Sequence, residues 1–314
     1  MTDSATDTAP PRVFRSDVRA ARKRLAGQLR KTPVFHTTVT GPDGPLPVSL
    51  KLEYLQHGGT FQVRGSLNAL LAAAGEPPHV VLAAGGNAGI AAALAAARLG
   101  RTCTVVVPET APHSKVAAMW AHGAEVRWHG TSHAEACAHA AELARERGAL
   151  YLPAHDSPAV VAGAGVLGLE LEEQVRGRPP VLAAVGGGAL VGGLAAALGR
   201  RQRVIGVEPE RRAVLRAALA ARWPVAVPAV DSAGPDRVGA IALELARRYD
   251  VPALTVTEDA VDAAREQLWR EFRIVAEPSG AAALAALVSG AFVPEKGSRT
   301  VVVLCGANGD PGAS

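Results

Sequence analysis

One stretch decides the fold that we expect for this chain: VLAAVGGGAL, residues 181–190. Its first five residues are small and apolar, as in a strand that is buried on both faces of a parallel sheet. Three glycines then form a turn, and a helix is expected from about Leu190 to Leu198. A strand that leads through a short turn into a helix is the unit from which parallel α/β sheets are built.

The same unit recurs along the chain. Strands are expected at residues 48–52, 80–84, 103–107, 124–128, 150–152, 181–185, 204–207 and 299–305. Helices are expected at residues 16–29, 113–122, 132–147, 190–198, 261–272 and 279–289, together with an Ala-rich helix that ends near Gly100. Ser16 is the expected N-cap residue of the first helix, and residues 40–47 form a Pro/Gly-rich connection. This alternation predicts an α/β protein with open twisted sheets and flanking helices.

Composition agrees with a globular protein of about two domains. The chain has 314 residues, of which 48% are apolar and 20% charged, so neither disorder nor a coiled coil is expected. Cys103, Cys137 and Cys305 are odd in number and far apart, which favours a reducing compartment, and we expect the cytoplasm. Residues 1–12 are predicted to be a flexible tail, and the polar start shows no signal peptide.

The charge pattern argues against nucleic-acid and membrane partners. The net charge of +4 comes from basic residues that are dispersed among acidic ones, and only five of the 33 are lysines. Residues 80–97 carry no charge, but they are mostly Ala and Gly, as in the core of a soluble protein. No P-loop, HExxH or paired CxxC motif is present and the nine histidines are scattered, so no metal is expected. Four histidines lie close together in the sequence without a metal-binding pattern, and they are expected at the surface or hydrogen-bonded: His122, His129, His133 and His139.

Three glycine-rich turns lie at the ends of predicted strands, at residues 83–89, 185–190 and 304–308. Such turns expose backbone N–H groups, and a helix N-terminus adds a dipole that favours an anion. Ligands of open α/β sheets bind at the carboxyl ends of the strands. Each turn alone is explained by glycine closing a tight bend, but the three together favour a site for an anionic ligand.

A further segment carries a family resemblance: LKLEYLQHGGTFQVRG, residues 50–65. It resembles the cofactor-lysine segment of fold-type II pyridoxal-phosphate enzymes, which belong to the tryptophan synthase beta superfamily, and is most similar to serine/threonine dehydratases. The resemblance continues, in the same order, at residues 111–116, 123–126, 206–209, 275–281 and 303–308. It therefore covers roughly residues 17–311.

The resemblance implies pyridoxal phosphate as cofactor and assigns residues to it. The residues matched to cofactor contacts are Phe61, Asn87, Gly186, Gly187, Gly188, Ala189, Leu190 and Cys305. In the family, the glycine loop holds the phosphate, the Asn bonds the phenolic oxygen and the residue at Cys305 faces the pyridine nitrogen. Ala189 stands where Gly is usual, which requires that its backbone not be left-handed. Asn87 is also explained as an ordinary turn residue, and Cys305 as a small buried one.

The amino-acid substrate is implied to lie beside the cofactor. The residues matched to substrate contacts are Thr60, Ala84, Gly85, Gly86 and Ala88. Their turn often carries Ser, and His after the Asn, in the family. With Ala and Gly in this turn, the backbone N–H groups can still bind a carboxylate. The turn then has no side chain that could act as an acid or a base.

Gln62 is the main departure from the family pattern. It occupies the position of the lysine that forms the Schiff base and moves the Cα proton, and its amide can do neither. No other lysine is expected to replace it. Gln62 is alternatively an ordinary polar loop residue, or a residue introduced to trap an active enzyme, although the altered turn at residues 84–88 disfavours such a single change.

Two hypotheses follow for the function. The first is a serine/threonine dehydratase-like ammonia-lyase, which eliminates the β-hydroxyl of a hydroxy amino acid to give a 2-oxo acid and ammonia. The second is a non-catalytic relative that binds pyridoxal phosphate or an amino acid without a covalent bond, as Gln62 suggests. By resemblance, a small domain covers residues 79–156 and a large domain covers residues 13–78 and 157–314, with the cofactor between them, and the chain forms a homodimer.

Overall fold

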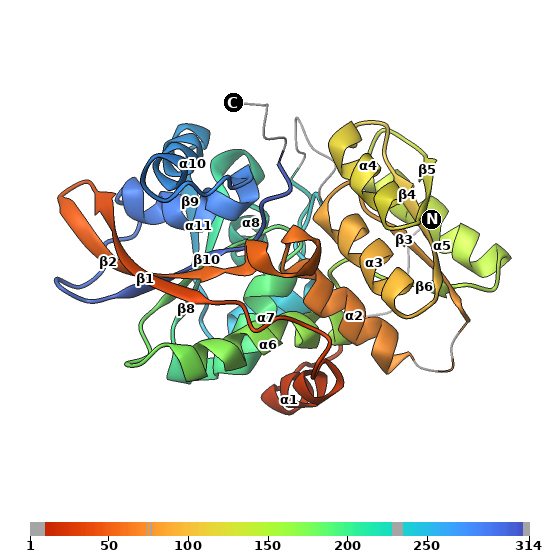
Figure 1. Ribbon diagram of the computed structural model, residues 1–314, viewed down its shortest axis with the longest axis horizontal. Coiled ribbons are helices and arrows are strands. Elements are labelled where there is room, and N and C mark those ends of the chain that lie inside the picture. The colour runs from red at the N-terminus through yellow and green to blue at the C-terminus, as the bar shows by residue number, and fades with distance from the viewer. Residues whose placement is uncertain (1–9, 74, 76, 228–234, 310–314) are drawn as a thin grey trace.

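The structure is a computed structural model that describes residues 10–73, 75, 77–227 and 235–309. Two open sheets lie side by side, each flanked by helices (Figure 1). The larger has the order β1-β2-β10-β7-β8-β9, and the smaller has the order β5-β4-β3-β6. Every neighbouring pair is parallel except the β1–β2 hairpin. The predicted α/β class with open sheets is confirmed, and the predicted domain boundaries remain a proposal.

The elements follow the chain in simple alternation. The strands are β1 (Val34–Gly41), β2 (Gly44–Leu52), β3 (His79–Ala83), β4 (Thr102–Val107), β5 (Glu125–Trp128), β6 (Leu150–Tyr151), β7 (Val181–Ala184), β8 (Val204–Pro209), β9 (Ala253–Val256) and β10 (Thr300–Leu304). The helices are α1 (Arg15–Arg24), α2 (Gln62–Ala72), α3 (Asn87–Arg98), α4 (His113–Ala121), α5 (His133–Glu146), α6 (Pro158–Gln174), α7 (Ala189–Leu198), α8 (Val214–Ala221), α9 (Ala240–Arg248), α10 (Glu258–Phe272) and α11 (Pro278–Val288).

Both sheets are buried on two faces, as the apolar strands predict. In β3, Val80 and Leu82 pack with the α3 side, whereas Val81 and Ala83 pack against α5. In β10, Val302 and Leu304 join the cluster under α11, whereas Val301 and Val303 join the cluster that contains α6 and α7. Successive side chains of a strand point to opposite faces of the sheet, which explains this alternation. It also determines which face of the sheet the last side chains of each strand point to.

The sequence misplaced several element ends. The first helix begins at Arg15 and ends at Arg24, and its N-cap residue is Phe14, not Ser16. The Asp17 side chain accepts a hydrogen bond from the Phe14 N–H at 2.8 Å, and this contact sets the start of the helix. Residues 40–47 are the tip of the β1–β2 hairpin instead of a connection. Helix α6 was missed because it is apolar on all sides and lacks an amphipathic period.

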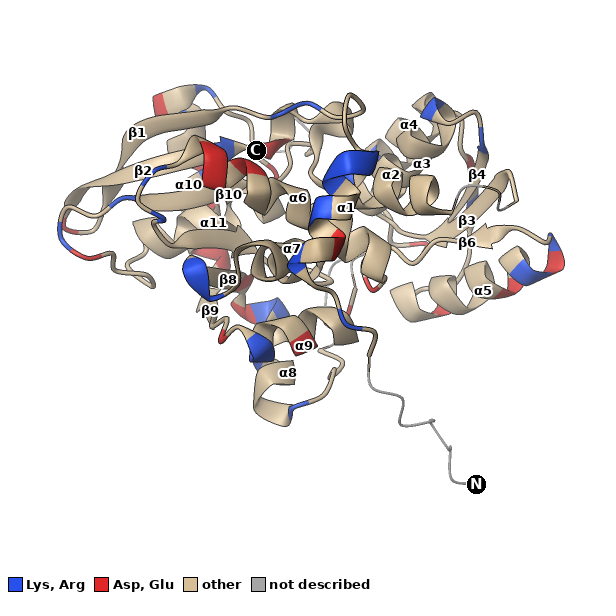
Figure 2. Cartoon of the chain, turned by 90° about the horizontal axis from the view of Figure 1, so that it is seen from below, with Lys and Arg blue, Asp and Glu red and all other residues tan. Residues whose placement is uncertain are grey.

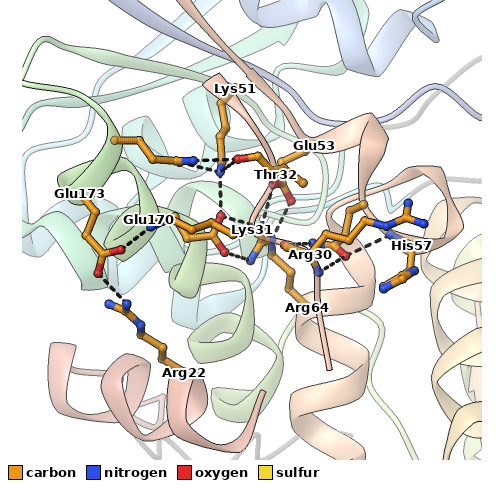
Figure 3. A network of polar contacts seen from close by, with 12 residues as sticks. Arg22, Arg30, Lys31, Thr32, Lys51, Glu53, His57, Arg64, Glu170 and Glu173 are labelled. Carbon is orange, nitrogen blue, oxygen red and sulfur yellow. Dashed lines mark hydrogen bonds and ion pairs between the residues drawn. The ribbon is translucent and has the colours of Figure 1, made fainter. Parts of the chain in front are cut away.

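A buried ion network joins β2, α2 and α6 (Figure 3). The Arg64 guanidinium, with a fully buried side chain, donates to both oxygens of Glu53 at 2.7 and 2.8 Å. It also donates to both oxygens of Glu170 at 2.7 and 3.0 Å. Lys51 Nζ reaches Glu170 at 2.7 Å and the Thr32 carbonyl at 2.8 Å. Burial alone would raise the pKa of Glu53, but the charge and hydrogen bonds of Arg64, together with Lys51 and Thr32, outweigh burial and hold that pKa below its usual value.

The remaining charges are spread over the molecule. Figure 2 shows acidic and basic residues close together on outer helices such as α5, as expected for a solvated face. Within the described residues, no helix is both long and apolar enough to cross a bilayer.

The buried network makes a stability prediction. We expect Arg64→Met to lower the free energy of unfolding by about 3–5 kcal/mol, because Glu53 and Glu170 would lose the cation that neutralises them. Arg22→Met is the matched control, since Arg22 pairs with Glu173 at 2.6 Å with a side chain 49% exposed. Arg22→Met should lower the free energy of unfolding by less than about 1 kcal/mol. Urea unfolding monitored by circular dichroism measures both, and equal losses would contradict this account.

Candidate active site

Three strand ends meet at one cavity between the two sheets. The turn after β3 precedes α3, the Gly186–Gly188 turn after β7 precedes α7, and Cys305 follows β10. All three line a cavity of about 640 Å³. The parallel strands explain this convergence, because their carboxyl ends lie at the same edge of each sheet.

The structure brings together nearly all of the residues that the sequence singled out. The cavity is lined by Phe61, Gln62, Ala84, Gly85, Gly86, Asn87, Ala88, Gly186, Gly187, Gly188, Ala189, Leu190 and Cys305. Thr60 is the exception, because it is fully buried and does not line the cavity. Its hydroxyl donates a hydrogen bond to the Gln62 side chain. The roles assigned to these residues remain predictions.

The glycine turn before α7 requires its glycines. Gly188 has φ +90°, a left-handed conformation, and a Cβ there would lie 2.5 Å from Ala242 Cβ. A Cβ at Gly187 would lie 2.2 Å from Cγ of His155. Ala189 is instead the first residue of helix α7 with ordinary φ, so its methyl group is tolerated. The turn therefore presents backbone N–H groups and a helix N-terminus to the cavity, which suits an anion.

Gln62 is held in the lining of the cavity. It is the first residue of α2, and the segment before it is bound to the end of β10, where the Phe61 N–H donates to the Cys305 carbonyl at 3.1 Å. Its side-chain oxygen accepts a hydrogen bond from Thr60. The amide therefore lies in the cavity at a defined place and offers no amine.

Lys115 is the only lysine among the described residues that line the cavity. Its Nζ donates to Glu277 at 2.6 Å and to Asn87 Oδ1 at 2.8 Å. The Asn87 amide in turn donates to Glu277. These contacts connect α3 and α4 on the smaller sheet to the start of α11 on the larger sheet, so they bridge the two walls of the cavity.

Cys305 is a neutral thiol. Burial raises its pKa above the usual range, and the nearby Glu277 carboxylate adds to that effect. Its Sγ donates to the Ser279 carbonyl at 3.2 Å. A neutral thiol can hydrogen-bond to a ring nitrogen but cannot act as its counter-ion.

Sequence reasoning missed two histidines of the cavity. His133 was expected at the surface or hydrogen-bonded, and its Nε2 does lie 3.4 Å from Cys137 Sγ. Both His133 and His155 also line the cavity, which the sequence did not predict. Nδ1 of His133 is buried without a hydrogen-bond partner in the described part of the chain. Neither residue lies in a recognisable motif, and only the packing of α5 against β3, β4 and β6 brings His133 to the site. Within the described residues, no group of three or more His, Cys, Asp and Glu side chains could hold a metal ion.

Comparison with known proteins gives relatives over most of the chain. Residues 25–306 match the family described as pyridoxal-phosphate dependent enzyme. The catabolic L-threonine dehydratase TdcB of Escherichia coli is 32% identical over 304 residues, which cover 94% of this chain and 92% of that protein. The biosynthetic L-threonine dehydratase IlvA of Salmonella typhimurium is 36% identical over 274 residues, which cover 83% of this chain and 53% of that protein. The chain thus spans about half the length of this second relative.

Solved structures show the same fold. A threonine deaminase from T.th. matches with a TM-score of 0.83 and 33% identity, covering 96% of this chain and 99% of that chain. A pyridoxal 5'-phosphate-dependent aspartate racemase matches with a TM-score of 0.85 and 28% identity, covering 96% and 98%. The two-sheet architecture is therefore shared with enzymes that differ in their named reactions.

The glycine turn makes a second prediction. We expect Gly187→Ala to lower the melting temperature by several degrees, because the new methyl group would overlap the His155 ring. Gly186→Ala is the matched control, since a Cβ there meets no atom within 4 Å, and it should leave the melting temperature within about a degree. Differential scanning fluorimetry compares the two variants. Equal melting temperatures would mean that His155 does not occupy this space.

Proposed function

The chain belongs to the pyridoxal-phosphate-dependent enzymes of the serine/threonine dehydratase-like type, and from that premise we propose that it is an ammonia-lyase acting on a hydroxy amino acid. The products would be a 2-oxo acid and ammonia. The observation that carries the proposal is the convergence of the three strand-end turns on one cavity. The threonine dehydratases and threonine deaminase among the relatives support the substrate class.

The residues present fit the cofactor without a covalent bond. The space that side chains at residues 187 and 188 would fill is already occupied by His155, Ala242 and Val238. Both positions therefore require glycine, and this turn can contact a ligand only through its backbone. The turn would hold the phosphate, and Asn87 and Cys305 would contact the ring. When bound, pyridoxal phosphate supplies an aldehyde that joins the amino group of an amino acid and a ring that draws electrons from the Cα–H bond.

The substrate carboxylate would lie at the start of α3. Residues 84–88 line the cavity at this helix N-terminus, where the dipole favours an anion. The Ala84 N–H already donates to the Val106 carbonyl at 3.0 Å, so the N–H groups of residues 85–88 would receive the carboxylate. A Cβ at Gly86 would meet no atom within 4 Å, which leaves room for a ligand beside the backbone. Ala84, Gly85 and Ala88 offer no side-chain acid or base, so they would position the substrate only.

Gln62 limits what the site can do with a proton. The amide neither holds the cofactor covalently nor accepts the Cα proton, and loss of one general base lowers a rate by about 10²–10⁴-fold. Lys115 is occupied, because its ammonium is bound to Glu277 and its side chain is only 14% exposed. We therefore expect slow elimination with a cofactor that remains exchangeable.

The second candidate function is binding without turnover. The hydrogen bond from Thr60 to Gln62 favours it, because it commits the side-chain oxygen of Gln62 to a structural role. Such a protein would bind pyridoxal phosphate, or an amino acid, and release it unchanged. We also expect a cytoplasmic homodimer with no nucleic-acid or membrane partner, which gel filtration with light scattering and cell fractionation would test.

The assay is 2-oxo acid formation from L-serine and L-threonine with added pyridoxal phosphate. We expect slow, cofactor-dependent product from the wild type, and a rate at least about 10²-fold higher from Gln62→Lys, because that variant regains an amine at the start of α2. Gln62→Met, which has similar size and no amine, is the control and should stay at or below the wild-type rate.

Each outcome of this assay decides between the candidates. A wild type that binds the cofactor but forms no product, with Gln62→Lys active, would establish binding without turnover. A Gln62→Lys variant that binds the cofactor and still forms no product from either amino acid would contradict the ammonia-lyase proposal.

A further inference from the structure

His155 packs directly on the glycine turn that precedes α7. The position of a Cβ at Gly187 would lie 2.2 Å from His155 Cγ and 2.5 Å from its Cδ2. The ring lines the same cavity as Gly186, Gly187 and Gly188. In the described part of the chain, the His155 ring makes no hydrogen bond. An imidazole that can donate a hydrogen bond thus stands beside a backbone anion cradle.

His133 is the neighbour of His155 in the cavity. The two ring centroids are 6.5 Å apart, and both rings line the cavity. Nε2 of His133 lies 3.4 Å from Cys137 Sγ, whereas Nδ1 is buried and has no partner among the described residues. A buried polar atom without a partner is costly, which points to a group that the protein binds there.

Burial keeps the His155 and His133 rings neutral as the protein stands. Burial lowers the pKa of His155 to about 4, and the neighbouring His133 lowers it further, whereas Asp156 and Asp236 act in the opposite direction. Burial also lowers the pKa of His133. The Asp156 carboxylate is already bound by the N–H groups of Ala240 and Ile241, so it does not form an ion pair with the ring. A dianion at the glycine turn would reverse this balance, because an opposite charge within about 4–6 Å favours the protonated imidazole.

We infer that His155, supported by His133, extends the glycine turn into a phosphate-monoester site and that this pair takes up a proton when the phosphate dianion binds. The proton comes from solvent, and no covalent bond forms or breaks. The inference rests on the proposed function, in which pyridoxal phosphate is the phosphate ester. Because Gln62 provides no covalent anchor, retention of the cofactor depends on such non-covalent contacts.

Isothermal titration calorimetry tests the inference. Pyridoxal phosphate is titrated near pH 7.5 in two buffers of different ionisation enthalpy, which gives the number of protons taken up, and pyridoxal without the phosphate is titrated in parallel. The variants are His155→Phe, which keeps a ring, and His155→Gln, which keeps a hydrogen-bond donor but cannot be charged. His139→Gln is the control, since His139 stacks on His129 at 4.0 Å and lies outside the cavity lining.

We expect the wild type and His139→Gln to take up protons with pyridoxal phosphate and to bind it more weakly as the pH rises. His155→Phe should bind it about 10-fold or more weakly, without proton uptake, and His155→Gln should bind with intermediate affinity, also without uptake. Affinity for pyridoxal should be the same in all four proteins. Unchanged affinity and proton uptake in His155→Phe and His155→Gln, with melting temperatures showing that both are folded, would overturn the inference.

The test separates this inference from the proposed function. A wild type that binds pyridoxal phosphate while the His155 variants behave identically would overturn the histidine site and leave the proposed function standing. A wild type that binds neither pyridoxal phosphate nor inorganic phosphate would overturn both.

Discussion

The buried contact of Arg64 with Glu53 and Glu170 holds the cavity in place. Arg64 lies on α2, two residues after Gln62, and connects this helix to the end of β2 through Glu53 and to α6 through Glu170. Bringing these charges out of water is costly, and only the complete set of hydrogen bonds offsets that cost. The network therefore tolerates one arrangement of α2, and that arrangement places Gln62 in the cavity.

Glycine residues allow the helices and strands around the cavity to pack closely, and this close packing positions the strand-end turns. The N-terminus of α11 approaches the end of β10 so closely that a Cβ at Gly280 would lie 2.1 Å from the Gly306 carbonyl oxygen. Helices α6 and α7 cross where a Cβ at Gly193 would lie 2.5 Å from the Gly165 nitrogen. Backbones this close together leave little freedom to the turns that follow the strands. The low aromatic content, 4% of residues, is thus consistent with a core built from close helix and sheet contacts.

Much of this could be predicted from the sequence, because apolar strands followed by glycine turns are local signals. The α/β class and the dehydratase-like family are confirmed, and the strands around β3, β7 and β10 were placed within one or two residues. Other features depend on the tertiary structure. Helix α6 has no amphipathic stripe because it is surrounded by protein. His155 and His133 lie in unremarkable sequence and reach the cavity only through packing, and the ion pair of Lys115 with Glu277 joins residues 162 positions apart.

We propose that this site holds pyridoxal phosphate without a covalent bond, because Gln62 stands at the start of α2. The most direct measurement is the mass of the protein after incubation with pyridoxal phosphate and borohydride, recorded under native and under denaturing conditions. The account predicts a cofactor-bound mass under native conditions and the bare polypeptide mass after denaturation. A cofactor mass that survives denaturation and maps to Lys115 or any other residue would contradict it.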